Sequence, residues 1–372
     1  MGSDDGAAHV GEKIGYGDLE GIINGDVSPP PEHLVILVNG IFGSASDWAF
    51  AAERMRSRLG RKFAIHCSGS SHAMKTCDGV DVMGKRLADE IREIIDKTPG
   101  VTKISFLAHS LGGLVSRYAI AELYCPPTKS EGFGEGVRDP SVNSKITSEA
   151  AQSEFTIGGL QPMTFVTLAT PHFGCRGTDQ LPSLRGIQAL EKTVENFAHW
   201  FVGKSGNHLF LTDWYDMELP LLRRMVADCK EGPFISSLAA FKRRVAYANV
   251  VNDQAVGWRT SSIRFPWETP DLDLNPVDPK YPHIIREEDT TPLLQDDGRE
   301  SAQGFPVSLE EEMVVGLLQL AWHRVDVRFR GETGSFQAHN LIQVKNARAH
   351  YAGVDVIEHV IDKQFGGNLE HN

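Results

Sequence analysis

The sequence predicts an α/β fold built on a mostly parallel, doubly wound sheet. Unbroken apolar runs such as LVILV (34–38) are typical of strands that are covered on both faces. Helical stretches of ten or more residues separate these runs, and strands that alternate with helices form parallel βαβ units. The 372 residues are 41% hydrophobic and 23% charged, a balance that can bury one large core.

Strands and helices alternate regularly in the first half of the chain. In order, the expected elements are a strand at 33–39, a helix at 46–59, a strand at 62–67, a helix at 79–97, a strand at 103–108, a helix at 111–124 and a strand at 163–170. Helical spacing is clearest over 79–97, where Val80, Met83, Leu87 and Ile91 make one apolar face.

The second half of the chain is less regular. In order, we expect a strand at 243–251, a helix at 308–320, strands at 324–329 and 336–345, and a closing helix at 354–365. Ser308 and Glu311 have the Ser-x-x-Glu spacing of a capping box, which marks the start of the first of these helices.

Two tails and three insertions accompany a single expected domain over 33–365. Residues 1–32 are polar and end in a proline-rich linker, and 366–372 form the second expected tail. The insertions are expected near 125–160, 171–240 and 258–308. They break the alternation of strands and helices, and the aromatic residues of 171–240 fit either a lid over a site or ordinary core packing.

The charge balance bears on the class of partner. The formal net charge is −12, from 49 acidic and 37 basic residues, and a field of that sign repels phosphate backbones. Nucleic acid is therefore not an expected partner. The sequence has neither a CxxC nor an HExxH spacing, and its GFGEG segment (132–136) follows no strand. We therefore expect neither a metal nor a cofactor.

The expected location is the cytoplasm. The first residues are acidic and lack the apolar stretch of a secretory signal, and no apolar run is long enough to span a bilayer. Five scattered cysteines and the lack of an Asn-x-Ser/Thr sequence fit a reducing compartment.

A candidate nucleophile stands in the sequence AHSLGG, where Ser110 follows one expected strand and precedes one expected helix. A nucleophile elbow has the pattern Gly-x-Ser-x-Gly because strand and helix backbones crowd the turn. Here Ala108 takes the first small position and Gly112 the second. The alternative is an ordinary strand-to-helix loop with a helix-capping serine.

Two backbone N–H groups are candidates for an oxyanion hole, which stabilises the tetrahedral intermediate of acyl transfer. Leu111 follows the candidate nucleophile directly. Ile41 lies in VNGIFG (38–43), after the first expected strand, where Gly40 lets the backbone turn. A plain glycine turn is the alternative for this loop.

A serine nucleophile needs a histidine base and an acid that orients it, and in doubly wound hydrolases the chain order is serine, acid, histidine. Asp253 follows the expected strand 243–251 and suits the acid, although a loop-capping aspartate would look the same. Among the later histidines, His339 and His350 fit the base equally well by position. His359 falls within the closing helix, where packing is the simpler role.

Seven segments in order resemble the putative serine esterase (lipase-like) family of plants and fungi. Along the chain they are VNGIFGSASDW, AHSLGG, TLATPHFG, HLFLTD, FKRRVAYANVVND, VGWRTSSI and AHNLIQVK, which extend over most of residues 33–365. The resemblance implies an α/β-hydrolase fold and lipase or esterase activity. It further implies that Ser110 is the nucleophile, Asp253 the acid and His339 the base. Asn39 departs from the family, because many relatives have a histidine there.

The expected function is hydrolysis of carboxylic esters, with acyl lipids as substrates, through a Ser-Asp-His triad and an acyl-enzyme. Such a lipase would make peripheral contact with a membrane or a lipid droplet. One alternative is a ligand-binding or receptor protein on the same fold with little turnover. Another is an acyltransferase that passes the acyl group to an alcohol or a thiol.

Overall fold

A seven-stranded sheet forms the centre of the computed structural model, which describes residues 29–127, 155–175, 203–215, 218–272, 274–293, 308–329 and 337–366. The strand order is β10-β11-β9-β6-β3-β1-β2. The strands are β1 (His33–Val38), β2 (Phe63–Cys67), β3 (Lys103–His109), β6 (Gln161–Leu168), β9 (Arg243–Asn249), β10 (Ile284–Asp289) and β11 (His323–Val327). Every neighbouring pair is parallel except β10 with β11.

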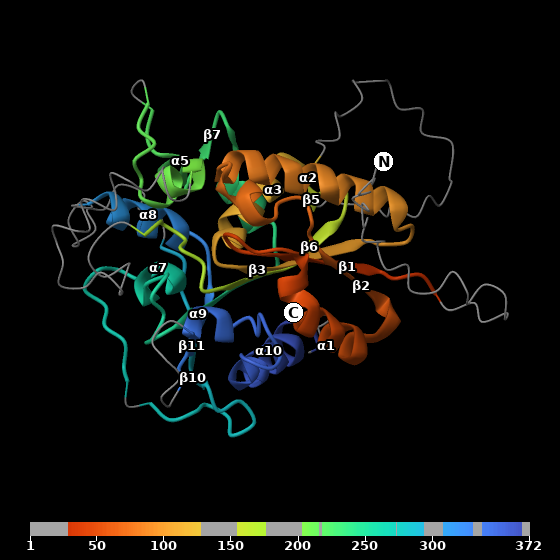
Figure 1. The fold of residues 1–372 in the computed structure, drawn as a ribbon. Coiled ribbons are helices and arrows are strands. Elements are labelled where there is room, and N and C mark those ends of the chain that lie inside the picture. Colours follow the sequence, from red (N-terminus) through yellow and green to blue (C-terminus); the bar gives the residue numbers. More distant parts are fainter. Residues whose placement is uncertain are drawn as a thin grey trace, which may run out of the picture.

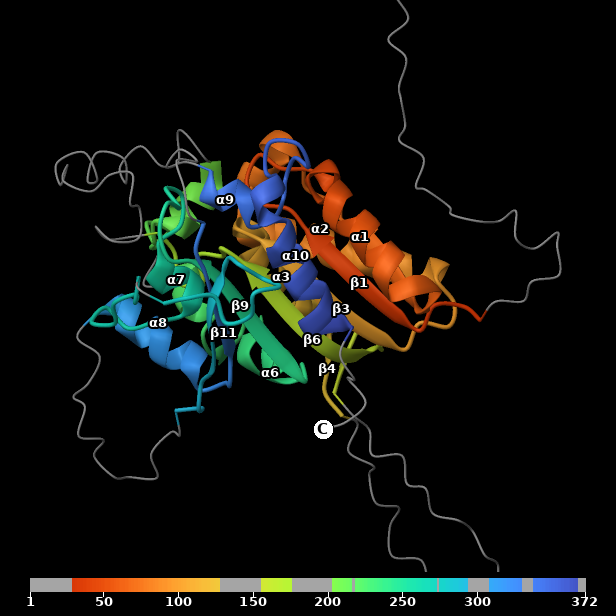
Figure 2. The same ribbon diagram turned by 90° about the horizontal axis from the view of Figure 1, so that it is seen from below.

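Helices cover both faces of the sheet (Figure 1). On one face lie α2 (Val80–Lys97), α3 (Leu111–Leu123), α5 (Leu221–Arg224), α6 (Phe234–Ala239) and α8 (Leu309–Leu318). On the other face lie α1 (Ala49–Leu59) and α10 (Val354–Val360), which stand in front of the strands in Figure 2. This is the expected doubly wound α/β-hydrolase arrangement.

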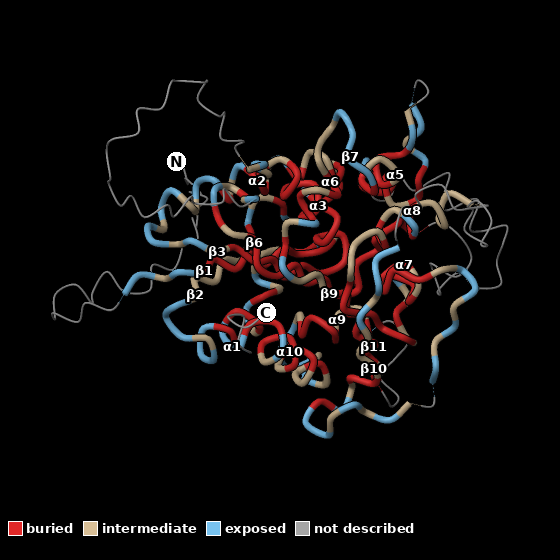
Figure 3. The backbone as a smooth tube through the Cα atoms, turned by 180° about the vertical axis from the view of Figure 1, so that it is seen from behind, coloured by how far each residue is buried: buried red, intermediate tan, exposed pale blue. Residues whose placement is uncertain are grey.

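The core is divided between the two faces because successive side chains of a strand point in opposite directions. In β1, Leu34, Ile36 and Val38 enter the cluster beneath α2 and α3, whereas Val35 and Leu37 enter the cluster beneath α1 and α10. The inner strands of the sheet are buried over most of their length, as Figure 3 shows, whereas the edge strands β2 and β10 are only partly buried. A strand apolar on both faces reads as an unbroken run, as LVILV does.

Most of the elements expected from the sequence are present. Ser308 caps α8 as its capping box predicts, by accepting a hydrogen bond from the Glu311 N–H at 3.2 Å. The closing helix continues from α10 into a π-helical turn, η7 (Ile361–Phe365). The expected helix 46–59 is divided into the 3₁₀ turn η2 (Ala45–Trp48) and α1.

The predicted strand at 336–345 is wrong. Residues 338–341 form the short helix α9 (Ala338–Leu341), and its last residue donates a backbone hydrogen bond to the Gln337 carbonyl. Ala338, Leu341 and Ile342 are all buried, at spacings of three and four residues. That spacing is helical, whereas a strand would bury every second residue.

The predicted insertion 258–308 contains parts of the main fold. It begins with α7 (Trp258–Ser262) and includes β10, the antiparallel edge strand. The sequence of β10, IIREED, has charged residues in four of six positions. Charge is common on edge strands because it discourages pairing with other chains, but it removes the apolar pattern by which a strand is recognised.

The remaining described elements are short. They are η3 (Gly60–Lys62), η4 (Ala73–Cys77), β4 (Tyr124–Cys125) paired with β5 (Thr156–Ile157), a helical segment at 203–209, β7 (Asp228–Cys229) paired with β8 (Gly232–Pro233), and η6 (Tyr351–Gly353). Most of the expected tails, and much of the expected insertions 125–160 and 171–240, lie outside the described residues. Within the described part of the chain, no helix has both the length and the apolar character needed to cross a bilayer.

The sheet brings distant segments together at one end. Since the inner strands are parallel, their carboxyl ends meet at the same edge. Gly40 follows β1, Ser110 follows β3 and Asp253 follows β9 at this edge. The candidate residues that the sequence places after separate strands therefore lie together.

Candidate active site

Ser110 occupies a sharp turn between β3 and α3. Its backbone has φ 53° and ψ −129°, a conformation that is costly for a residue with a side chain and that recurs at functional sites. Neighbouring groups hold it there. The Ser110 N–H donates to the Leu168 carbonyl at 2.9 Å, and the Thr170 hydroxyl donates to the Ser110 carbonyl at 2.9 Å.

The small residues around this turn are explained by close backbone contacts. A Cβ atom on Gly112 would lie 2.5 Å from the Val38 carbonyl oxygen, and one on Gly40 would lie 2.8 Å from the Ser110 Cβ. Both contacts are too short for any side chain. Ala108 is fully buried at the end of β3, where its methyl group belongs to the core beneath α3. Its departure from the elbow pattern is therefore accommodated.

His339, on α9, lies between Ser110 and Asp253. Its Nε2 is 3.0 Å from the Ser110 Oγ, and its Nδ1 is 3.0 Å from the Asp253 Oδ2. A carboxylate accepts, so Nδ1 carries the proton that it donates to Asp253. Nε2 is then free to accept the proton of the Ser110 hydroxyl. This is the arrangement of groups in a Ser-His-Asp triad.

Asp253 is held by three further donors in the turn after β9. The Asn249 amide donates to Oδ2 at 2.8 Å, and the Ala255 and Val256 N–H groups donate to Oδ1 at 3.0 and 2.9 Å. Burial would raise the pKa of Asp253, but the facing His339 ring and these donors outweigh it, so the pKa lies below its ordinary value. Asp253 is therefore ionised at neutral pH.

Two residues with candidate oxyanion N–H groups lie near Ser110: Leu111 follows it directly, and Ile41 is in the loop after β1. Among the described residues, no hydrogen-bond acceptor is found for the N–H of Ile41 or of Leu111. The Asn39 amide donates to the Gly40 carbonyl at 3.1 Å and to the Ser71 carbonyl at 3.3 Å. Asn39 therefore ties this loop to the segment that carries Ser71.

A pocket of about 150 Å³ opens onto Ser110 and His339. Ile41, Leu111 and Cys175 are among the residues that line it. Burial, reinforced by the charge of Asp253, raises the pKa of the Cys175 thiol to about 12. The thiol therefore stays protonated, and Ser110 is the better placed nucleophile in this pocket.

The other two histidines considered from the sequence make different contacts. His350 accepts a hydrogen bond from the Asn346 N–H at 3.0 Å within its own loop. His359 is buried on α10, where its Nδ1 lies 2.8 Å from the Tyr247 hydroxyl. The histidine in contact with Ser110 is His339, which the residue spacing had left level with His350.

Sequence reasoning missed two polar residues of the site. Asn249 supports the acid, and His109 donates from Nε2 to the His339 carbonyl at 2.7 Å. His109 occupies the variable position of the elbow pattern, and Asn249 ends a strand, so neither carries a sequence signal. Within the described ranges, no group of three or more metal-ligating side chains is assembled.

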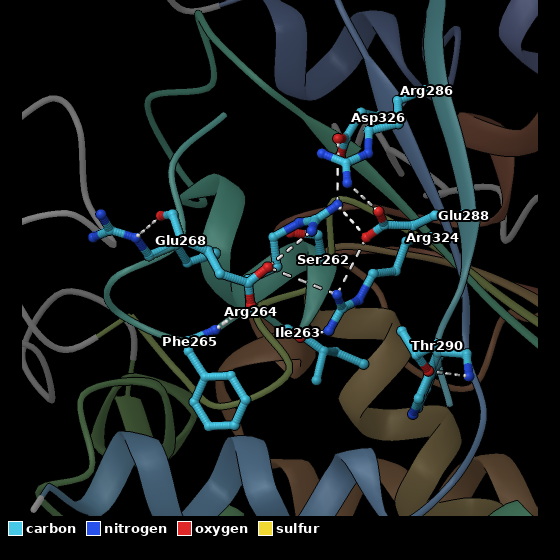
Figure 4. A network of polar contacts seen from close by, with 12 residues as sticks. Ser262, Ile263, Arg264, Phe265, Glu268, Arg286, Glu288, Thr290, Arg324 and Asp326 are labelled. Carbon is cyan, nitrogen blue, oxygen red and sulfur yellow. Dashed lines mark hydrogen bonds and ion pairs between the residues drawn. The ribbon is translucent and has the colours of Figure 1, made fainter. Parts of the chain in front are cut away.

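A set of ion pairs surrounds the buried side chains of Arg264, Arg324 and Asp326 and is here named the arginine cluster (Figure 4). It ties the end of α7 to β10 and β11. Its members are Arg264, Arg286, Arg324, Glu268, Glu288 and Asp326. Arg264 is central, with Nη2 2.7 Å from Glu288 and Nη1 3.0 Å from Glu268, and it lies over the Trp258 ring at 4.6 Å.

Comparison with known proteins gives two sets of sequence matches. The family model "Putative serine esterase (DUF676)" matches residues 28–263. The chain is 28% identical over 279 residues to putative lipase ROG1 of Saccharomyces cerevisiae, covering 74% of this chain and 34% of that protein. It is 28% identical over 239 residues to putative lipase C4A8.10 of Schizosaccharomyces pombe, covering 62% and 26%. The chain thus spans about a third or less of the length of these relatives.

A solved structure is also similar at a distance. The mature form of lipase BlEst2 from Bacillus licheniformis is 17% identical to this chain and has a TM-score of 0.36. The match covers 67% of this chain and 84% of the BlEst2 chain. A likeness at that level adds nothing to the sheet topology described above.

Proposed function

The chain belongs to the putative serine esterase family, and from that premise we propose that it hydrolyses carboxylic esters of acyl lipids through an acyl-enzyme on Ser110. The observation that carries the proposal is the unbroken series of contacts from Ser110 through His339 to Asp253, at 3.0 Å and 3.0 Å. The choice of acyl lipids is supported by the names of the fungal relatives, each of which is called a putative lipase.

In the first half of the reaction, the Ser110 Oγ attacks the ester carbonyl carbon while His339 Nε2 takes the hydroxyl proton. The carbonyl electron pair moves onto oxygen, where the Ile41 and Leu111 N–H groups donate to it. The intermediate then collapses, the C–O bond to the alcohol breaks, and His339 returns its proton to the departing alcohol. Asp253 stabilises the imidazolium and keeps the ring in its reactive orientation.

In the second half, water takes the place of the alcohol. His339 removes a proton from the water, the hydroxide adds to the acyl carbon, and a second oxyanion forms in the same place. Collapse breaks the bond to Ser110 Oγ, which recovers its proton from His339. The products are one carboxylic acid and one alcohol, with the enzyme unchanged.

Labelling with a fluorophosphonate probe tests the proposal, since an activated serine is phosphonylated and an inert one is not. We expect the wild-type protein to be labelled at Ser110 and to release fatty acid from esters graded by acyl length and from acylglycerol emulsions. Ser110→Ala is the matched control and should do neither. Absence of both labelling and release in the wild type would instead favour a ligand-binding protein. Transfer of the acyl group to an added alcohol in preference to water would favour an acyltransferase.

A further inference from the structure

His109 connects three parts of the site that are far apart in sequence. It ends β3 directly before Ser110 and is buried, with a relative exposure of 4%. Its Nε2 donates to the His339 carbonyl at 2.7 Å, and the two rings lie 4.6 Å apart at 49°. On its other side, Nδ1 lies 3.3 Å from the position that a Cβ on Gly40 would take. The His109 ring therefore lies between α9 and the loop after β1 that carries Gly40.

The segment that carries His339 needs such an anchor. α9 has four residues, Ala338–Leu341, so it is a single turn and not part of the sheet ladder. A helix this short gains little stability from its own hydrogen bonds. The carbonyl of His339 itself is fixed from outside, by His109. Through this bond a residue of the central strand holds the main chain of the histidine that contacts Ser110.

The protonation state of His109 suits this role. Burial lowers the pKa of His109 well below its ordinary value, and repulsion from a charged His339 lowers it further. The hydrogen bond to the His339 carbonyl and the charge of Asp253 oppose this shift without cancelling it. Lys345, on the pocket rim in an ion pair with Asp47, also disfavours a charge on His109. His109 is therefore neutral, and because Nε2 must carry the proton that it donates, Nδ1 carries none.

We propose that His109 is a positioning residue for the general base: its Nε2–H holds the main chain of His339 in the place from which the ring reaches both Ser110 and Asp253. This inference rests on the proposed function. It concerns a hydrogen bond to the carbonyl of His339, so it predicts an effect on kcat with little change in KM. Small displacements of a catalytic group cost up to about 100-fold in rate.

Two substitutions of similar length test the proposal. In His109→Gln the side-chain amide can donate from near the place of Nε2, whereas His109→Met fills the same space without a donor. With a short-chain ester we expect kcat within about threefold of wild type for the Gln variant and a fall of about 10- to 100-fold for the Met variant. A Met variant with the kcat of the Gln variant would overturn the proposal.

A second readout does not depend on turnover. In a proton NMR spectrum, the proton that His339 Nδ1 donates to Asp253 gives a downfield resonance when the ring is held in place. We expect this resonance in the wild type and in His109→Gln, and its loss or broadening in His109→Met. An unchanged resonance in the Met variant would contradict the proposal.

Folding and the proposed function are checked separately. Should His109→Met fail to fold, His109→Asn replaces it, because its shorter amide lies at the place of Nδ1 and cannot reach the His339 carbonyl. Full kcat in the Asn variant would also overturn the proposal. If the wild-type protein itself is not labelled at Ser110, the proposed function has failed. If it is labelled and all variants turn over equally, the positioning role alone has failed.

Discussion

Two polar regions of this molecule, each built around buried side chains, use their polar groups in opposite ways. In the arginine cluster, three guanidinium groups face three carboxylates, and each charged group forms an ion pair with another member of the cluster. In the set of Ser110, His339 and Asp253, a single carboxylate orients one ring, and the series ends at a hydroxyl beside a pocket.

This difference predicts that the arginine cluster contributes to the stability of the fold, whereas the set of Ser110, His339 and Asp253 contributes to the reaction rate. Removing one partner from a buried ion pair leaves an uncompensated charge, so damage to the arginine cluster should appear in the free energy of unfolding. Removing Ser110 leaves no such charge, so damage there should appear in the rate and not in the stability. The following variants test how far this separation holds, from the largest expected effect to the smallest.

The largest effect is expected for Ser110→Ala, which we predict to lower kcat by about 10⁶-fold if the three residues act as a unit. The melting temperature should change little. Ser116→Ala is the matched control, because Ser116 is a buried serine on α3, the helix that follows Ser110, and its hydroxyl donates to the Gly112 carbonyl at 2.8 Å. A rate near that of wild type in Ser110→Ala would contradict the assignment of the nucleophile.

Asp253→Asn should lower kcat by about 10⁴-fold, because an amide that donates to His339 stabilises the wrong tautomer of the ring. Steady-state kinetics with a soluble ester measures this. The chain offers a second histidine–aspartate pair as a control, His283 with Asp355, in which Nδ1 lies 2.7 Å from the carboxylate. Asp355→Asn should leave kcat nearly unchanged, and an equal loss in both variants would argue against a special role for Asp253.

Arg264→Met should lower the free energy of unfolding by about 3–5 kcal/mol, because Glu268 and Glu288 lose a buried partner. Chemical denaturation measures the change, and kcat per folded molecule should stay close to that of wild type. Arg92→Met is the matched control, because the ion pair of Arg92 with Asp89 is exposed and is expected to contribute about 0–1 kcal/mol. Equal stability of the two variants would show that the arginine cluster does not hold the fold together.

A smaller effect is expected in the pH dependence of stability. The pKa of Asp253 is lower in the folded than in the unfolded chain, so the unfolded chain binds more protons between the two values. This contribution to stability is complete above the unfolded value, about 3.9, and is lost as the pH falls through the folded value. We expect the difference in unfolding free energy between wild type and Asp253→Asn to shrink below about pH 4. Parallel curves would contradict the lowered pKa.

The smallest effect is expected for His350→Ala. His350 hydrogen-bonds within its own loop, so its loss should change kcat by less than about twofold and stability by about 1 kcal/mol or less. His339→Ala, by contrast, should abolish turnover. A large loss of kcat in His350→Ala would reopen the choice between the two histidines that position along the chain could not make.

Those parts of the site that follow buried strands could be predicted from the sequence. Ser110 and Asp253 each come directly after an apolar run, and parallel strands bring their carboxyl ends together. His339 was different, since its segment is a one-turn helix that was taken for a strand, and the family resemblance rather than spacing singled it out. Position in the chain says little about a residue that reaches the site from outside the sheet.

The arginine cluster could not be predicted for a related reason. Its members are distributed over 264–326, in a stretch whose charges look solvated when taken one at a time. Burial of charge depends on pairing in three dimensions, and β10 was missed because the charges that take part in this pairing conceal its strand pattern. Asn249 and His109 were invisible for the same reason: their roles are defined by partners distant in the chain.

The contact between Gly112 and the carbonyl groups that end β1 also limits how far sequences sharing this site can diverge. No side chain can be added at position 112 without separating α3, the helix that follows Ser110, from β1, the strand that leads to the Gly40 loop. Position 108 already carries a methyl group, so it tolerates either alanine or glycine. A search for distant relatives with the same site should therefore require glycine two positions after the serine and accept either alanine or glycine two positions before it.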